Sequence, residues 1–178
     1  AARAGLLAVS HGRAHRGAHP AGRLELPPLT TRTRSVFVCG HQRPRRAHGV
    51  FILKFPFVRP PLVNKAINKI KPDYIFHFAA QSLVGASYKN PIYNFQTNFN
   101  GTLNILEAMR LKKVKRIIYS ASSSCYGIPF RVPTSEKDKI NPMYPYAFSK
   151  YVGEQLIQHY AKIYKINNIS FRLFDVYG

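Results

Sequence analysis

Hydrophobic positions follow regular patterns only in the second part of this chain, from about residue 63 onward. Short runs rich in aromatic and β-branched residues there predict buried strands, because such runs are typical of the interior of a sheet. Longer segments around these runs predict helices. The expected strands cover 73–78, 115–119 and 169–174, and the expected helices cover 63–70, 91–110 and 145–164.

The helix expected over 91–110 has a clear start signal. Asn90 is a favourable cap, and Pro91 suits the first helical position. Apolar residues then recur at spacings of three and four, which places them on one helix face, and we expect this face to pack inward. They are Ile92, Phe95, Phe99, Leu103 and Leu106.

The alternation of strands and helices predicts an α/β fold, with a parallel sheet and helices on its faces. Only three strands are expected, so the sequence predicts a partial Rossmann-like sheet that is truncated at both ends. Complete Rossmann-like sheets normally have about six or more strands. We therefore expect an unpaired edge, bare apolar helix faces and a poorly stable chain.

Residues 1–62 differ from the rest in composition and charge. The net charge is +20, and this part holds ten Arg, one Lys and one acid, whereas residues 63–178 hold twelve Lys, four Arg and six acids. Arg, Ala, Gly and Pro have GC-rich codons, whereas the Lys, Ile, Asn, Tyr and Phe of the later part have AT-rich ones. We interpret residues 1–62 as a basic segment that is disordered or not native to the protein, and residues 63–178 as a separate unit.

Three other interpretations of residues 1–62 stay open. An Arg-rich, acid-poor segment suits a targeting peptide, although its Pro and Gly content works against an amphipathic helix. A basic arm for nucleic acid is another interpretation, but no aromatic residue is interleaved before Phe37, so we regard nucleic acid as an unlikely partner. Metal binding would use His11, His15 and His19, but no acid or Cys completes a site, so we expect no metal.

Two further features limit the class of protein. Cys39 and Cys125 stand far apart, which argues against a zinc module or a disulfide scaffold and fits a reducing compartment. No run of about 18 apolar residues is present, so no segment is expected to span a membrane. We expect a cytoplasmic protein with no membrane partner.

Polar and small residues follow each expected strand. Ligands of such sheets bind outside the carboxyl ends of the strands, so these segments would meet at one edge. They are His77–Ser82, Ser120–Gly127 and Asp175–Gly178. The segment Tyr146–Lys150 at the start of the last helix would join them.

Tyr146 and Lys150 are four residues apart, so a helix would place them on one face. A phenol has a pKa of about 10, and a nearby ammonium favours the phenolate and lowers that pKa. A serine hydroxyl from the adjacent loop would hydrogen-bond both the phenol and a substrate hydroxyl. This trio is suited to moving the proton of an alcohol while its hydride leaves. Ser122, 24 residues before Tyr146, is the candidate serine.

Residues 63–178 resemble the extended short-chain dehydrogenase/reductase family, in particular its NAD-dependent UDP-sugar 4-epimerases. The stretches that carry the resemblance are HFAAQSLVGASYKNP (77–91), NFNGTLNILEA (98–108), SASSSCYG (120–127), YPYAFSKYVGEQL (144–156) and RLFDVYG (172–178). The resemblance implies that residues 63–178 are the C-terminal part of a Rossmann-like epimerase/dehydratase domain.

The resemblance also implies roles for individual residues. Ser122, Tyr146 and Lys150 match the catalytic positions, and Tyr146 and Lys150 would also contact NAD. Other matches line the cofactor or support its loop, namely Ala79, Ala80 and Asn98. Matches near the bound sugar are Ser123, Phe174 and Asp175, of which the last is usually Asn in the epimerases.

The implied reaction is a reversible oxidation at C4 of a UDP-sugar. Tyr146 would take the proton of the 4-hydroxyl, hydride would pass to NAD, and the keto sugar would turn over and take the hydride back. Related 4,6-dehydratases carry an Asp-Glu pair directly after the catalytic Thr, where this chain has Ser123 and Ser124, so we favour an epimerase. The resemblance also implies a homodimer through helices 91–110 and 145–164.

The sequence departs from this family in residues 1–62. The glycines there never take the G-x-x-G-x-x-G spacing that holds the pyrophosphate in the family, so we expect weak NAD binding and compromised activity. Two alternatives therefore stay open. One is a non-catalytic fragment of a nucleotide-sugar epimerase or 4,6-dehydratase, and the other is a nucleic-acid-binding protein that uses residues 1–50.

Overall fold

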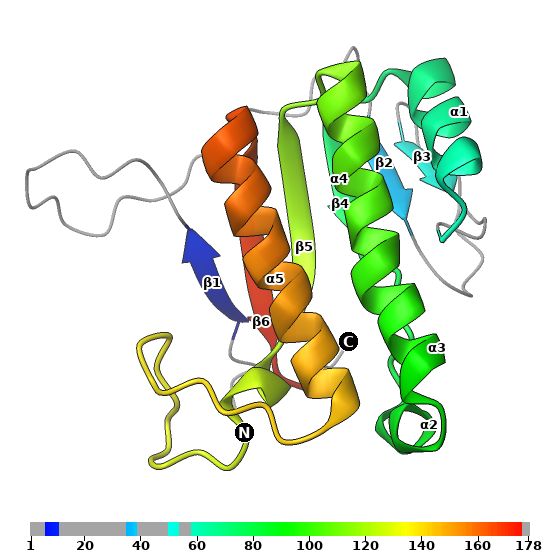
Figure 1. The fold of residues 1–178 in the computed structure, drawn as a ribbon. Coiled ribbons are helices and arrows are strands. Elements are labelled where there is room, and N and C mark those ends of the chain that lie inside the picture. The colour runs from blue at the N-terminus through cyan, green and yellow to red at the C-terminus, as the bar shows by residue number, and fades with distance from the viewer. Residues whose placement is uncertain (1–5, 11–34, 39–49, 54–57, 176–178) are drawn as a thin grey trace, which may run out of the picture.

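The computed structural model describes the backbone of three short segments, 6–10, 35–38 and 50–53, and residues 58–175 with their side chains. Within these ranges the chain forms one six-stranded sheet, with helices packed against it (Figure 1). The strands are β1 (Leu6–Ser10), β2 (Ser35–Val38), β3 (Val50–Leu53), β4 (Tyr74–His77), β5 (Arg116–Ser122) and β6 (Asn167–Leu173).

The strand order is β1-β6-β5-β4-β2-β3, and all neighbours are parallel except β1 and β6. The expected α/β class and parallel sheet are confirmed. Strands β4, β5 and β6 are the three that the hydrophobic pattern predicts, with bounds shifted by one to three residues.

The three expected strands, β4, β5 and β6, are left with no unpaired edge, so the prediction of an unpaired edge is wrong. β2 pairs with the free edge of β4 and β3 extends the sheet further, while β1 pairs with β6. The added segments 35–38 and 50–53 read SVFV and VFIL, which are β-branched and aromatic runs suited to a sheet. The rest of residues 1–57, including Cys39, His11, His15 and His19, lies outside the described residues.

The main helices are α1 (Pro60–Ile70), α4 (Gly101–Lys112) and α5 (Pro145–Tyr164). In the part of the chain that the structure describes they all cover one face of the sheet (Figure 1). The direction of the connections explains this. The chain steps the same way across the sheet from β4 to β5 to β6, and right-handed crossovers then place every helix on the same side.

Shorter helical segments connect β4 to α4. They are α2 (Val84–Lys89), α3 (Pro91–Phe95) and the π-helical turn η1 (Gln96–Asn100), which runs directly into α4. The capping prediction for this helix is confirmed, because the Asn90 side chain accepts a hydrogen bond from the Tyr93 N–H at 2.9 Å. A 3₁₀ turn, η2 (Ser123–Tyr126), follows β5.

The predicted inward face of this helix is wrong in its first half. Ile92 is 70% exposed, and the buried positions there are polar: Asn94, Thr97, Asn98 and Thr102. The first half packs against the polar loop that follows β4, which needs hydrogen-bond partners, so the polar side chains turn inward. Apolar burial begins only in the second half, at Ile105, Leu106, Ala108 and Met109.

The hydrophobic core lies between the sheet and the three main helices. Its largest fully buried side chains come from every layer, and they include Ile67 of α1, Ile75 of β4, Ile105 of α4, Ile117 of β5 and Ile157 of α5. The core therefore fixes α5 against β5, and with it the position of the residues at the start of α5. Among the described residues, no helix is long and apolar enough to cross a membrane.

Candidate active site

A cleft of about 320 Å³ lies where the parallel strands end. The loops after β4, β5 and β6 form it together with the first turn of α5, as the edge rule for parallel sheets predicts. It brings together most of the residues that the sequence singled out. Its lining includes Ala80, Ser122, Ser123, Tyr146, Lys150, Phe174 and Asp175.

The first turn of α5 is fixed from another helix. Pro145 at the first helical position has no N–H to satisfy, and no side chain of the N-cap residue Tyr144 caps the helix. Instead, the buried Ser87 hydroxyl of α2 accepts a hydrogen bond from the Tyr146 N–H at 3.2 Å. The same hydroxyl donates to the Val84 carbonyl at 2.7 Å, which holds it in place. Ser87 is a positioning residue that sequence reasoning missed.

Tyr146 points its phenol into the cleft beside Ser122. Burial raises the pKa of Tyr146 above its usual value, whereas a hydrogen bond with the Ser122 side chain acts in the opposite direction. The expected lowering of this pKa by Lys150 is not found, because burial, Ser122 and Tyr144 are the groups that act on it. In the ligand-free protein the phenol is therefore held protonated at neutral pH.

Lys150 lies one helical turn after Tyr146 and is only 2% exposed. Its ammonium lies over the ring of Tyr119, with 4.3 Å between Nζ and the ring centroid. Burial lowers the pKa of Lys150 to about 7. None of the ion pairs among the described residues includes Lys150.

The serines after β5 form a hydrogen-bonded turn. Ser122 Oγ lies 2.8 Å from Ser124 Oγ and accepts the Ser124 N–H at 3.2 Å, which makes Ser122 the cap of η2. Ser123 and Ser124 also line the cleft. Ser122 is thus held by its own turn while its hydroxyl reaches Tyr146.

Asn98 supports the loop after β4 rather than lining the cleft. Its Oδ1 accepts the Gln81 N–H at 2.7 Å, and its Nδ2 donates to the Gln81 carbonyl at 3.1 Å and to Ser149 Oγ at 2.9 Å. Ser149 in turn donates to the Tyr146 carbonyl at 2.8 Å. Asn98 thereby couples the loop to the start of α5. Ala79 is buried beneath this loop, and Ala80 faces the cleft.

Two titratable residues near the cleft, His77 and Cys125, are buried. His77 on β4 has its Nε2 2.9 Å from Thr102 Oγ1. Burial, with the charge of Lys150, lowers the pKa of His77 to about 3, so it is neutral at pH 7. Cys125 is also buried, and burial raises the pKa of its thiol to about 11.

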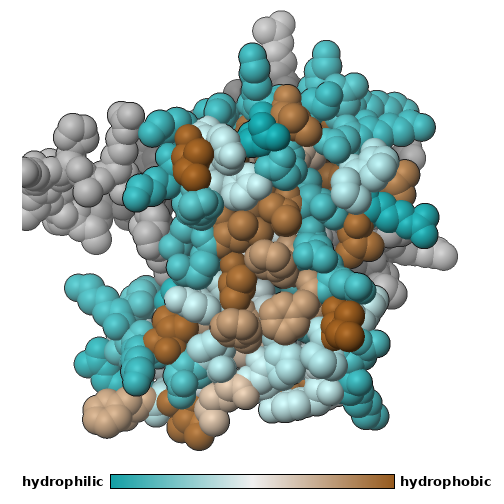
Figure 2. Space-filling model, viewed as in Figure 1, coloured by the Kyte–Doolittle hydropathy of each residue, from teal (hydrophilic) through white to brown (hydrophobic). Residues whose placement is uncertain are grey.

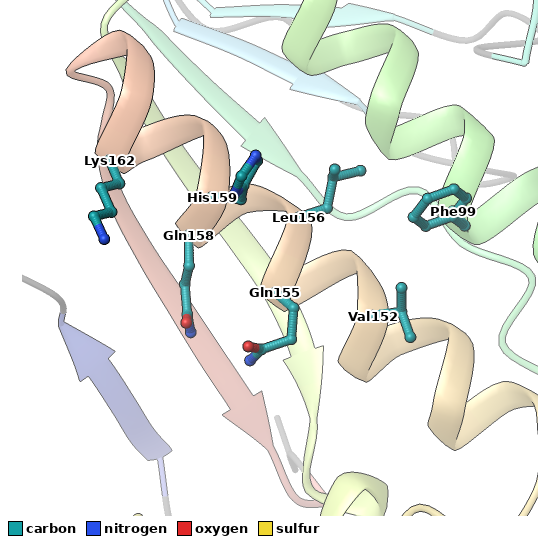
Figure 3. Close-up of a pocket in the computed structure, with 7 residues that line it drawn as sticks. All are labelled: Phe99, Val152, Gln155, Leu156, Gln158, His159 and Lys162. Carbon is teal, nitrogen blue, oxygen red and sulfur yellow. The ribbon is translucent and has the colours of Figure 1, made fainter.

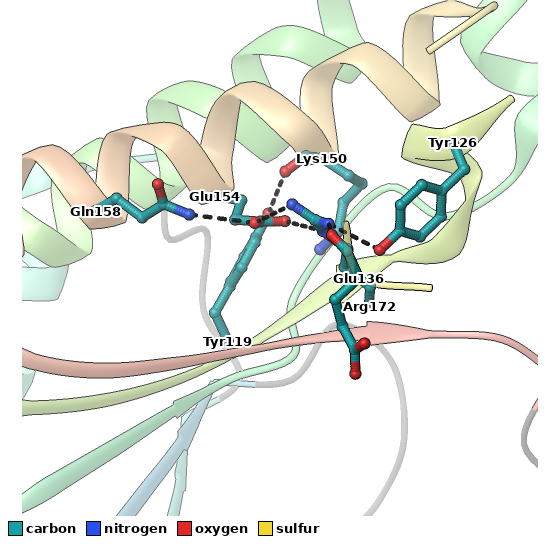
Figure 4. Close-up of polar contacts among 7 residues, drawn as sticks. All are labelled: Tyr119, Tyr126, Glu136, Lys150, Glu154, Gln158 and Arg172. Atoms are coloured by element: carbon teal, nitrogen blue, oxygen red, sulfur yellow. Dashed lines mark hydrogen bonds and ion pairs between the residues drawn. The ribbon is translucent and has the colours of Figure 1, made fainter. Parts of the chain in front are cut away.

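A buried polar network behind the cleft was not visible in the sequence pattern. Arg172 of β6 donates to both carboxylate oxygens of Glu154 on α5, at 2.8 and 3.0 Å, and to the phenol oxygen of Tyr126 at 2.8 Å (Figure 4). It therefore ties β6, α5 and the serine turn η2 together. Its members are far apart in sequence, so only the fold brings them together.

The comparison with protein families decides the identity at the family level. The family model described as GDP-mannose 4,6 dehydratase matches residues 42–178. The chain belongs to the NAD-dependent epimerase/dehydratase family. The match begins earlier than the resemblance that we expected from residue 63, and it includes β3.

Several curated proteins that the chain resembles are named as epimerases. The chain is 36% identical over 117 residues to the UDP-glucose 4-epimerase of Lactobacillus helveticus, a match that covers 66% of this chain and 36% of that protein. The chain therefore spans about a third of the length of this relative. A match to about a third of this relative does not carry the activity of the whole relative over to this chain.

Solved structures of epimerases share the fold. A UDP-glucose 4-epimerase from Brucella ovis, in complex with NAD, superposes with a TM-score of 0.68 at 24% identity over 76% of this chain and 50% of that one. A Thermotoga maritima UDP-glucose 4-epimerase with UDP-glucose gives a TM-score of 0.67 at 25% identity, over 75% and 45%.

The described residues fit one end of NAD, the nicotinamide riboside. A buried ammonium at the cleft wall, Lys150, suits the ribose hydroxyls, and the small side chain of Ala80 lets a ligand approach the loop backbone. The sequence offers no comparable site for the pyrophosphate of NAD. The family's glycine-rich loop has no counterpart in the sequence of residues 1–62.

Proposed function

We propose that this protein acts as a nucleotide-sugar 4-epimerase, with Ser122, Tyr146 and Lys150 as its catalytic residues. One observation carries the proposal. The phenol of Tyr146 is hydrogen-bonded to Ser122 and lies one helical turn from a buried lysine, at the wall of a cleft formed by the strand ends.

The protein's own part in the reaction is to move a proton and to hold the sugar. Tyr146 accepts the proton of the sugar 4-hydroxyl and later returns it. Ser122 orients that hydroxyl through its bond to the phenol, and the turn formed with Ser124 keeps Ser122 in place. Because burial raises the pKa of Tyr146, ligand binding and the charge of Lys150 must favour the phenolate for this step.

NAD supplies the acceptor and donor of hydride when it is bound. Lys150 would hold the nicotinamide ribose, and Asn98 would keep the loop after β4 in the shape that receives the cofactor. The missing glycine-rich spacing leads us to expect weak NAD binding.

Epimerisation is favoured over 4,6-dehydration by the residues after Ser122. Dehydration needs an acid and a base for the C5 proton and the departing 6-hydroxyl, and Ser123 and Ser124 provide neither at neutral pH. Among the described residues that line the cleft, Asp175 is the only carboxylate. The names of relatives support a UDP-sugar as substrate.

The test uses the full chain with NAD and UDP-glucose, and follows UDP-galactose by chromatography. Conversion is expected, with Tyr146→Phe and Ser122→Ala each lowering the rate about 10²- to 10⁴-fold. Tyr151→Phe is the matched control, because Tyr151 is on the same helix and lines no part of the cleft. A folded chain that binds NAD and converts no sugar would leave the non-catalytic fragment as the better description.

We also propose a homodimer through the helices of the expected dimer face. Hydrophobic side chains gather at the centre of the helical face of the molecule (Figure 2). A groove of about 510 Å³ on this face is lined by α5 and η1, and Val152, Leu156 and Phe99 supply its apolar part (Figure 3). Ile92, Tyr93 and Phe148 on α3 and α5 are exposed.

Sedimentation measures the oligomeric state. The wild-type chain is expected to be dimeric, and Val152→Glu, which places a charge among the apolar side chains of the groove, is expected to be monomeric. Leu111→Glu, at an exposed apolar position near the end of α4, serves as a control of equal charge change outside the groove. A monomeric wild type would remove the proposal.

A further inference from the structure

Tyr119 lies beneath Lys150 in a way that no sequence motif indicates. The ring is 1% exposed on β5, and the Lys150 ammonium lies over its face at 4.3 Å from the centroid. The face of an aromatic ring carries negative charge density and attracts a cation, and this attraction is strongest where water is excluded. Here both partners are buried.

The groups around Lys150 leave the ring as its closest favourable contact. Glu154, the nearest carboxylate on the same helix, is committed to Arg172 through two hydrogen bonds. His77 on β4, next to the Tyr119 ring, is neutral and offers no negative charge. Tyr146 holds its proton. Asp175 lines the same cleft, but burial is the cause of the lowered pKa of Lys150 and no carboxylate offsets it.

The backbone around the pair is built to admit the ring. Tyr119 Oη donates to the Lys150 carbonyl at 3.4 Å. Gly153 stands three residues later on α5, and a Cβ there would lie 2.6 Å from Tyr119 Oη. Any side chain at 153 would push the ring away, so the glycine lets Tyr119 reach under the helix.

We propose that Tyr119 is a positioning residue, whose ring face holds the ammonium of Lys150 at the cleft wall and favours its charged form. The ring does this without an ion pair, which would compete with a ribose hydroxyl for the same ammonium protons. The benefit to cofactor binding rests on the proposed epimerase function, whereas the effect on the ionisation of Lys150 does not.

The test measures the titration of Lys150 directly in the full chain. Lysine side chains are labelled with ¹³C at Cε, the Lys150 signal is assigned by its loss in Lys150→Arg, and its chemical shift is followed by NMR against pH. Tyr119→Leu removes the ring. In this variant the titration midpoint of Lys150 is expected to fall by about 0.4 to 1.5 pH units below that of wild type. Tyr119→Phe keeps the ring and is the matched control, expected to titrate within about 0.3 units of wild type.

A second series of variants tests the proposal even if Tyr119→Leu does not fold. Phenylalanine at 119 is replaced by phenylalanines of increasing ring fluorination, which weakens the negative face with little change of shape. The Lys150 midpoint is expected to fall stepwise with fluorination. A midpoint that does not respond to fluorination, or that is equal in Tyr119→Leu and Tyr119→Phe, would overturn the proposal.

The two proposals fail separately. If the midpoints follow the expected order but wild type converts no UDP-sugar, the role of Tyr119 stands and the epimerase proposal falls. If wild type converts UDP-sugar but the midpoints do not move, the epimerase proposal stands and the role of Tyr119 falls.

Discussion

Arg172 and Glu154 form a buried ion pair between β6 and α5, in which the guanidinium donates to both carboxylate oxygens. Glu154 is fully buried and Arg172 nearly so. Because Arg172 also holds the Tyr126 phenol, the pair anchors the serine turn to the helix that carries Tyr146 and Lys150. A charge left alone at this depth would be strongly unfavourable.

Removing one partner should therefore destabilise the protein markedly. Glu154→Gln is expected to lower the free energy of unfolding by about 3 to 5 kcal/mol, because it leaves the Arg172 charge buried without a counter-ion. The double variant Glu154→Leu/Arg172→Met removes both charges and should recover most of this loss. Urea unfolding measures each value.

The exposed pair Arg131 and Asp138 is the matched control. Asp138→Asn is expected to cost much less than Glu154→Gln, because water screens this pair. An equal cost for Glu154→Gln and Asp138→Asn would contradict the importance that we give to the buried pair.

Ser87 should stabilise the start of α5 by about as much as a typical helix N-cap does. Ser87→Ala leaves the Tyr146 N–H without its acceptor and is expected to cost about 0.5 to 2 kcal/mol in unfolding free energy. Ser87→Thr keeps a hydroxyl and should recover part of the loss. Hydrogen exchange at the amides of the first turn of α5 should accelerate in Ser87→Ala, and unchanged exchange there would count against the cap.

How far the sequence predicts this structure depends on the range of the interactions. Helix 145–164 was predicted with its observed bounds, because Pro145 marks the start and a continuous pattern follows. The cleft was predicted because parallel strands end at one edge. The cap on Tyr146 was not, because Ser87 lies 59 residues earlier and nothing local indicates the contact.

The prediction of which face of helix 91–112 points inward was wrong for a different reason. Hydrophobic periodicity finds the apolar face, but the polar loop after β4 needs the amide of Asn98, so the polar face turns inward there. Strands β2 and β3 were missed because composition, rather than local pattern, guided the interpretation of residues 1–62.

Gly153 and Tyr119 should be energetically coupled. Gly153→Ala is expected to destabilise by about 1 to 3 kcal/mol, because the new Cβ meets the Tyr119 hydroxyl at 2.6 Å. In the Tyr119→Phe background that hydroxyl is absent, and the same substitution should be neutral or stabilising by up to about 1 kcal/mol, since alanine favours a helix over glycine. A double-mutant cycle in urea gives the coupling, and additive effects would show that the close approach is unimportant.

His77 should make the stability depend on pH in a defined window. Its pKa is about 3 in the folded protein and about 6.5 in an unfolded chain, so between these values the unfolded chain binds a proton that the native protein does not. The contribution is fully present above pH 6.5 and is lost as the pH falls, by about 1.4 kcal/mol per pH unit. Hydrogen bonds lower the pKa values of the Glu107 and Asp138 carboxylates from their ordinary values, so these groups titrate below pH 5. Lys150, with a pKa of about 7, changes its protonation mainly above pH 6. Urea unfolding between pH 6 and 5 should therefore give a slope in wild type that is largely lost in His77→Asn. A wild-type slope in His77→Asn would show that His77 is not the group responsible.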